Sequence, residues 1–313
     1  MRLYKNLVCM SREEIILKYI DKNEFGLEIG PSHRPIASKK DGFKVHTLDH
    51  LSKEGLIEKY KEHQVDTSYI EDVDFIWNGE SFLEITGKPN YYKWIIASHV
   101  IEHTTDLVRF LISCEEVLSE DGVVSLVIPD KRFCFDYFRP LTSLGQVVDA
   151  YFNDRKIHSE GTVAEYYASV VTKNGHIAWM DILPAEYRMV HTLEEAKSLM
   201  NEVHSKKTYF DLHAWCFTPS SFRLLINDLH ELGLISLQEV DFHTTVDHEF
   251  YLTLSRNGKG ISESRMELFQ KTQFEIKNTD IPIRFKFKVI VFFHKVIFKI
   301  KYYSRKVKNL FSR

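Results

Sequence analysis

The sequence predicts an α/β protein with a doubly wound sheet, and three stretches support this prediction. A strand that ends in a tight turn spans 27–35, and a second apolar run, 45–48, ends in Asp49 about twenty residues after the first turn. Residues 92–129 show a short apolar strand, an amphipathic helix and a second apolar strand, which is the pattern of a βαβ unit. Short, continuous apolar runs are typical of parallel strands that are buried on both faces.

The chain begins with a helix and a strand. Ser11 and Glu14 have the spacing of a capping box, which predicts a helix that runs to Ile20. The strand Leu27–Ile29 follows, and Gly30 then lets the backbone turn where a side chain would block a ligand. A dinucleotide site needs G-x-G-x-x-G, but here only Gly30 is present, and Ser32 and Arg34 stand where further glycines would be wanted. The turn has little room for pyrophosphate, so we expect a cofactor without phosphate.

The acid at the end of the next strand indicates what that cofactor contains. In nucleotide-binding α/β sheets, an acid in the position of Asp49 accepts hydrogen bonds from ribose hydroxyls. The two turns together therefore predict a nucleoside-bearing cofactor across the ends of two adjacent strands. A polar helix at 52–63 and a short strand at 68–77 with acidic residues near its end are expected next.

The strand at 92–98 leads directly into His99-Val100-Ile101-Glu102-His103, and a helix follows up to Leu118. We expect Asp121-Gly122 to end this helix and 123–129 to form the fifth strand. H-x-x-E-H is also a zinc-hydrolase signature, in which two histidines one helical turn apart bind the metal. That geometry requires the interior of a helix, whereas here His99 falls at the end of a strand. No metal ligand is therefore predicted, and a zinc-dependent hydrolase remains the alternative.

An insertion follows the fifth strand. Residues 131–215 contain helical patterns at 144–153, 163–171 and 193–202 and are rich in Tyr and His. Because ligands bind at the carboxyl ends of the strands in α/β folds, we interpret 131–215 as a cap that binds the acceptor. Thr218 and Pro219 then begin a helix that ends at Gly233, and strands at 235–243 and 249–255 bring the sheet to seven.

Charge is distributed unevenly along the chain. The net charge is −3, but residues 281–313 carry ten Lys and Arg and no acid, which leaves −13 on the rest. Apolar residues recur in this tail from Phe285 to Leu310 at helical spacing. We expect 256–280 to be a polar linker and 281–313 to be an amphipathic helix on an anionic membrane surface, not a nucleic-acid-binding arm. No uncharged stretch of the tail approaches the ~20 residues that span a bilayer.

Composition is that of a soluble globular protein, with 44% hydrophobic and 27% charged residues in 313. The four cysteines are far apart in the sequence and show no C-x-x-C pair, which indicates a reducing compartment. The chain begins with no secretory segment, so we expect a cytoplasmic location, peripheral to the inner face of the plasma membrane through the tail.

Several motifs together resemble one family. Over about residues 25–255 the segments LEIGPSHRP, VHTLDH, ASHVIEH, DKRFCFDYFRP and HAWCFTPSSF resemble class I S-adenosylmethionine-dependent methyltransferases. They are most similar to a bacterial subgroup that is associated with surface-polysaccharide synthesis. The resemblance implies a methyltransferase domain over 1–255, S-adenosylmethionine as cofactor, and an antiparallel hairpin at the edge of the sheet. It also implies a set of cofactor-binding residues: Glu28, Gly30, Pro31, Ser32, Asp49, His50, Asp74, Phe75, Ala97 and Ser98.

Within that set, the resemblance implies that Asp74 contacts the adenine amino group of the cofactor and that Phe75 packs against the adenine ring. Asp72 is the alternative acid. The acceptor it implies is a sugar of a cell-surface glycan or its precursor, with a small metabolite or a protein as alternatives. The aromatic residues of the cap would stack on sugar rings: Phe133, Phe135, Tyr137, Tyr166, Tyr167 and Trp215. Deprotonation of a sugar hydroxyl needs a base, and four candidates are expected near the strand ends: His99, His103, Asp130 and His213. A nicotinamide oxidoreductase and a non-catalytic scaffold of the same fold are the other rival classes.

Overall fold

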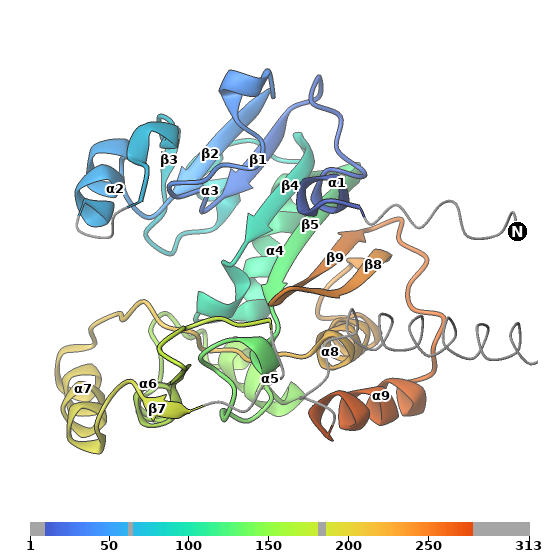
Figure 1. Cartoon of the computed structure of the whole chain (residues 1–313). Helices are drawn as coiled ribbons and strands as arrows, with labels where there is room; N and C mark the ends of the chain where they lie inside the picture. The colour runs from blue at the N-terminus through green and yellow to red at the C-terminus, as the bar shows by residue number, and fades with distance from the viewer. Residues whose placement is uncertain (1–9, 62–64, 181–185, 278–313) are drawn as a thin grey trace, which may run out of the picture.

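The computed structural model describes residues 10–61, 65–180 and 186–277, and it is built on a seven-stranded sheet in the order β3-β2-β1-β4-β5-β9-β8 (Figure 1). Strands β1 to β5 are parallel, while β9 runs antiparallel to both β5 and β8. The predicted α/β fold and the hairpin at the sheet edge are thus confirmed. The strands are β1 (Gly26–Ile29), β2 (Val45–Asp49), β3 (Phe75–Ile76), β4 (Tyr92–Ser98), β5 (Leu118–Pro129), β8 (Gln238–Val246) and β9 (Glu249–Ser255).

Helices cover both faces of the sheet because the buried strands alternate their side chains between two cores. Ile95 and Ala97 of β4 face the larger core, which α4 and α8 cover. Trp94 and Ile96 face the smaller core under α1. The helices outside the cap are α1 (Arg12–Ile16), α2 (Lys53–Tyr60), α3 (Phe82–Thr86), α4 (Leu107–Val117), α8 (Pro219–Glu231) and α9 (Arg265–Lys277), with 3₁₀ turns η1 (Lys39–Asp41), η2 (Thr67–Tyr69) and η3 (Ile101–His103).

The cap follows β5 and returns to the sheet at Phe217, which pairs with Asp130 in a parallel bridge. Its predicted helices are present as α5 (Leu144–Phe152), α6 (Glu160–Ser169) and α7 (Leu193–Lys206). The sequence pattern missed a two-stranded sheet of β6 (Val171–Lys173) and β7 (Tyr187–Met189), and the 3₁₀ turn η4 (Lys131–Phe133). Figure 1 shows α6, α7 and β7 grouped on the side of the sheet toward which β4 and β5 run.

Three local predictions were wrong. The Ser11–Glu14 capping box is present, but α1 ends at Ile16 instead of Ile20. The third strand consists of Phe75 and Ile76 alone, so the acidic residues precede it. Helix α4 ends at Val117, before Asp121-Gly122, and β5 begins at once. A Cβ on Gly122 would lie 3.0 Å from the Tyr92 carbonyl oxygen, so this glycine permits close strand pairing at a register shift.

The segment 256–280 is not a plain linker, since α9 occupies most of its described part. Leu268 of α9 is buried, and Arg265 forms a bidentate ion pair with Asp228 of α8. The polar sequence misled the prediction because α9 buries only a narrow stripe. The predicted amphipathic helix at 281–313 lies outside the described residues. Among the described helices, none has the length and apolar character needed to cross a membrane.

Candidate functional site

The chain changes direction across the sheet between β1 and β4, because β2 and β3 lie on one side of β1 and β4 on the other. Ligands of open α/β sheets bind in the crevice at such a switch point, outside the carboxyl ends of the strands. Gly30 ends β1 here with a φ of +64°, and a Cβ at this position would lie 2.8 Å from Cγ2 of Val100. Both the backbone angle and the close approach therefore require glycine.

Asp49 lies beside this turn and is almost completely buried. Its Oδ2 accepts a hydrogen bond from the Ser32 backbone N–H at 2.9 Å, which holds Ser32 at a φ of +53°. Its Oδ1 accepts from the backbone N–H of His50 at 2.8 Å and contacts the His50 ring nitrogen Nδ1 at 2.6 Å. The structure thus brings together Gly30, Ser32, Asp49 and His50, with the half-buried Pro31 in the turn between them.

Glu28 supports the turn from below. Its carboxylate accepts hydrogen bonds from the backbone N–H groups of Ile36 at 2.7 Å and Ala37 at 3.0 Å, so it holds the loop that follows the turn. Burial raises the pKa of Glu28 to about 7, against the effect of these two hydrogen bonds.

The remaining predicted cofactor residues are more dispersed. Asp74 precedes β3, where its Oδ2 accepts from the Thr47 N–H at 2.7 Å and from Lys39 Nζ at 2.6 Å. Phe75 packs edge-on against His46. Ala97 is buried, and the Ser98 hydroxyl accepts from Arg12 at 2.9 Å. Asp72, the alternative acid, is exposed and pairs with Lys53.

Of the four predicted bases, Asp130 lies apart from the others in its contacts. It is fully buried, it forms an ion pair with the Arg132 guanidinium, and its Oδ2 accepts from the Thr245 hydroxyl at 2.6 Å. These contacts hold the segment after β5 against the β8–β9 turn. Both carboxylate oxygens of Asp130 therefore accept hydrogen bonds within the protein.

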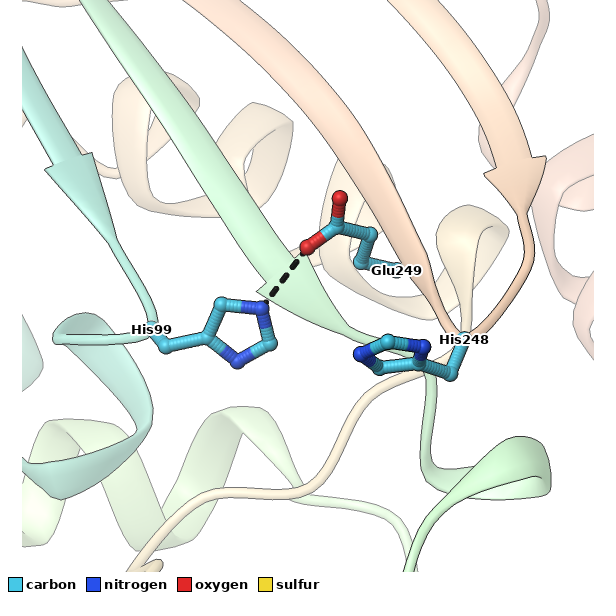
Figure 2. Close-up of side chains that lie close together, drawn as sticks. All are labelled: His99, His248 and Glu249. Atoms are coloured by element: carbon cyan, nitrogen blue, oxygen red, sulfur yellow. Dashed lines mark hydrogen bonds and ion pairs between the residues drawn. The ribbon is translucent and has the colours of Figure 1, made fainter. Parts of the chain in front are cut away.

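His99 occupies the end of β4 with a φ of +55° and points toward β9 (Figure 2). Its Nε2 lies 2.8 Å from Oε2 of Glu249, and the His248 ring is 6.0 Å away between centroids. Oε1 of Glu249 also accepts hydrogen bonds from Arg12 Nε at 2.6 Å and from the Tyr251 hydroxyl at 2.7 Å. Burial lowers the pKa of His99, but its contacts with Glu102 and Glu249 outweigh burial and raise the pKa to about 9.

Glu102 is fully buried, like Asp130. The residue is 0% exposed, and within the described part of the chain no hydrogen bond reaches either carboxylate oxygen. Three histidine nitrogens surround Oε1: His99 Nδ1 at 3.5 Å, His213 Nε2 at 3.8 Å and His103 Nε2 at 4.0 Å. The structure therefore brings three of the four predicted bases together around one buried carboxylate.

The cap supplies a carboxylate to each of two of these histidines. Asp211 contacts His103 Nδ1 at 2.8 Å, and Asp136 contacts His213 Nδ1 at 2.5 Å. Arg139 in turn donates to Asp136 at 2.7 Å and to the His213 carbonyl at 2.7 Å. Burial would raise the pKa of Asp136, but His213 and Arg139 lower it to about 2.

The aromatic residues of the cap divide into two groups. Phe133 and Trp215 are buried, and Trp215 donates its indole N–H to the Thr104 carbonyl at 2.7 Å, so these rings build the cap. Phe135, Tyr137, Tyr166 and Tyr167 remain partly exposed, and the Phe135 ring lies 4.5 Å from the His213 ring between centroids. Of the six predicted aromatic residues, only these four have exposed ring surface that a ligand could contact.

No protein-family model matches the chain, and no curated protein matches it in sequence. Solved structures with a similar arrangement include a candidate zinc-dependent alcohol dehydrogenase from Rhodobacter sphaeroides, with 12% identity over 78% of this chain and 88% of that chain and a TM-score of 0.41. The mitomycin 7-O-methyltransferase MmcR has 11% identity over 78% and 52% with a TM-score of 0.36. A candidate S-adenosyl-L-methionine-dependent methyltransferase from Methanococcus maripaludis has 11% identity over 80% and 84% with a TM-score of 0.36. These TM-scores are too low for the similarities to indicate a function. A proposed function must therefore rest on the site itself.

Sequence reasoning missed the acids that orient the histidines. Asp136 and Asp211 lie in the cap, 75 residues apart, and they meet only because the cap folds back over the sheet. Glu249 follows the last hairpin turn. The one usable signal was the motif around Glu102, because two histidines flank a glutamate at the end of a strand.

Proposed function

We propose that this protein is an S-adenosylmethionine-dependent methyltransferase. The observation that carries the proposal is the contact between the Gly30 turn and Asp49 at the switch point of the sheet, through the 2.9 Å bond from Ser32 N–H to Asp49 Oδ2. A carboxylate there can accept ribose hydroxyls, as the resemblance to class I methyltransferases implies. The seven-stranded sheet with its edge hairpin is what the same resemblance implies.

The turn argues against a dinucleotide as the cofactor. Pyrophosphate binds to free backbone N–H groups at a glycine-rich helix start. Here the Ser32 N–H is bonded to Asp49, and Ser32 and Arg34 add side chains where glycines would be needed. A sulfonium cofactor has no phosphate, so it does not need these groups.

The acceptor is inferred from the cap. Methyl transfer from a sulfonium needs mainly alignment of the acceptor, and a hydroxyl acceptor must also lose its proton. The group around Glu102 lies between the end of β4 and the cap. Burial lowers the pKa of His99 and of His103, but contacts with carboxylates outweigh burial, raise the pKa of both and favour their protonated forms. His213, which Asp136 orients through Nδ1, is therefore the base that we propose. The partly exposed Phe135 and Tyr166 rings beside it can stack on a sugar ring. A sugar hydroxyl of a surface glycan or its precursor is therefore the acceptor that we propose.

Calorimetric titration of the full chain with S-adenosylhomocysteine and with NADH tests the cofactor. We expect binding of the first alone. Asp49→Ala removes hydrogen bonds to a charged acceptor, which contribute ~1.5–3 kcal/mol each, so affinity should fall at least about tenfold. Asp121→Ala, an exposed acid paired with Lys93, is the matched control and should bind normally. Unchanged binding by a folded Asp49→Ala protein would refute the assignment.

A transfer assay with radiolabelled S-adenosylmethionine tests the acceptor. Nucleotide sugars, lipid-linked glycans and peptides are offered in parallel to the same protein. Transfer to the first or second class supports the sugar proposal, whereas transfer confined to peptides overturns it without affecting the cofactor assignment.

A further inference from the structure

Glu102 has three charge partners but no hydrogen bond in the described structure. Burial of a carboxylate is costly unless the charge is both paired and hydrogen-bonded, or coordinates a metal. Glu102 is 0% exposed, and both of its oxygens lack a hydrogen bond among the described residues. Its backbone carbonyl, by contrast, accepts from the Ala214 N–H at 2.7 Å, so the segment itself is fixed against the cap.

Two of the surrounding histidines direct Nε2 toward Glu102 Oε1. Asp136 is hydrogen-bonded to Nδ1 of His213, while Asp211 lies 2.8 Å from Nδ1 of His103 as an ion pair without hydrogen-bond geometry. A histidine that binds a metal nearly always gives its other ring nitrogen to a carboxylate or carbonyl in this way. The three ligand atoms of Glu102, His103 and His213 all lie within 4.8 Å of one another.

We propose that Glu102, His103 and His213 bind a divalent transition-metal ion, with zinc as the best-fitting ion. Zinc–nitrogen and zinc–oxygen bonds of about 2.0–2.2 Å in tetrahedral geometry place ligand atoms about 3.4 Å apart. The distances from Glu102 Oε1 to the two Nε2 atoms are 3.8 Å and 4.0 Å, so small side-chain movements complete the site. Two imidazoles and one carboxylate favour zinc, iron or cobalt over magnesium or calcium, which prefer oxygen.

The side chains of His99, His248 and Glu249 are also spaced closely enough to bind a metal, but the Arg12 guanidinium already pairs with Glu249. Arg12 contacts both Glu249 oxygens, at 2.6 Å and 3.3 Å, and neutralises the carboxylate that a metal would need (Figure 2 shows Glu249 and the two histidines). His99 is therefore a positioning residue in this proposal, since it bridges Glu249 and the Oε1 side of Glu102.

The proposed site differs from that of a zinc hydrolase with an H-x-x-E-H helix. There the two motif histidines are ligands and the glutamate is the base. Here His99 is turned to Glu249, Ile101–His103 is a 3₁₀ turn, and Glu102 is itself a ligand. Three protein ligands leave a coordination position open. If the proposed function holds, the metal would acidify an acceptor hydroxyl in that position and would take the place of a free imidazole in its deprotonation, because the Nε2 atoms of His103 and His213 would then be ligands.

The test is metal binding by the full chain, which does not depend on methyl transfer. The metal-free protein is titrated with Zn²⁺, Co²⁺ and Mg²⁺ separately, with calorimetry and, for Co²⁺, the visible absorption spectrum as readouts. We expect one Zn²⁺ per chain, a Co²⁺ spectrum of nitrogen and oxygen ligation, and a raised Tm because the metal joins the cap to η3. Binding of neither Zn²⁺ nor Co²⁺, or of Mg²⁺ alone, overturns the proposal.

Variants locate the ion. His213→Ala should weaken Zn²⁺ binding at least about 100-fold. Glu102→Gln keeps the shape of the side chain, so weaker binding by this variant as well would show that the loss in His213→Ala does not result from misfolding. Asp136→Asn should weaken Zn²⁺ binding about 10–100-fold through the orientation of His213. The matched control His248→Ala should leave binding unchanged. Loss of Zn²⁺ in His248→Ala with retention in Glu102→Gln would place the ion in the other group and refute the proposal.

Discussion

At the scale of single residues, the acidic residues near the carboxyl ends of the strands make different kinds of contact. Asp49 lies beside the Gly30 turn at the switch point, whereas Glu28 accepts hydrogen bonds from the Ile36 and Ala37 N–H groups of the loop that follows the turn. Asp130 is bound by Arg132 and Thr245. Acidic side chains of one sheet edge therefore serve loop support and structural pairing, and ligand binding is the role that we propose for Asp49.

The buried Glu28 predicts a pH dependence of stability. Its pKa rises from 4.5 to about 7 on folding, so the folded state holds the proton more tightly than the unfolded state between these values. The free energy of unfolding that Glu28 contributes is greatest below about pH 4.5 and falls as pH rises toward about 7. Glu28→Gln has no titrating group at this position.

Denaturant unfolding of the wild type and Glu28→Gln at about pH 5 and about pH 8 checks this sign. The wild type should lose stability relative to Glu28→Gln at the higher pH. A difference between the two proteins that is independent of pH would contradict the raised pKa.

The sequence was sufficient to name candidate site residues, but not their contacts. Gly30, Asp49, His99, His103 and His213 could be named because they sit at strand ends or in a motif. The pairing of His213 with Asp136, or of His99 with Glu249, depends on how the cap and the last hairpin close over the sheet. Such contacts join residues that are 77 and 150 positions apart, and no local pattern encodes them.

At the scale of elements, strong local signals were confirmed and weak ones failed. The continuous apolar run of β4 and the Thr218-Pro219 start of α8 gave correct elements. The third strand failed because two residues have no periodicity to detect. Helix α9 was not predicted because its sequence is mostly polar. Its stability comes from packing against α8, through Leu268 and the Arg265–Asp228 pair.

The packing of α9 gives a prediction with an internal control. Leu268 is 1% exposed, while Met266 on the same helix is 64% exposed. Leu268→Ala should lower the free energy of unfolding by about 2–5 kcal/mol, and Met266→Ala should change it by less than about 0.5 kcal/mol. Chemical denaturation measures both. Equal, small effects would mean that α9 is not part of the folded unit.

At the scale of the whole molecule, charge separates the chain into two parts. Residues 281–313 carry ten Lys and Arg side chains and no acid, whereas the rest of the chain has a net charge of −13. We propose that this tail attaches the protein to anionic lipid, which also suits a lipid-linked glycan as acceptor. The apolar residues from Phe285 to Leu310 favour lipid over nucleic acid, because a basic arm that binds nucleic acid needs no continuous apolar stripe.

Co-sedimentation with vesicles tests the tail in the intact protein. Each cation near an anionic surface contributes ~1 kcal/mol, and this contribution decreases with salt. The full chain should pellet with anionic vesicles at low salt, less at high salt, and weakly with neutral vesicles. A chain that ends at Asn278 keeps all of α9, including the Leu268 contact, so its folding should be unaffected. That shorter chain should stay in the supernatant. Equal pelleting of both chains with anionic vesicles at low salt would show that the attachment lies elsewhere.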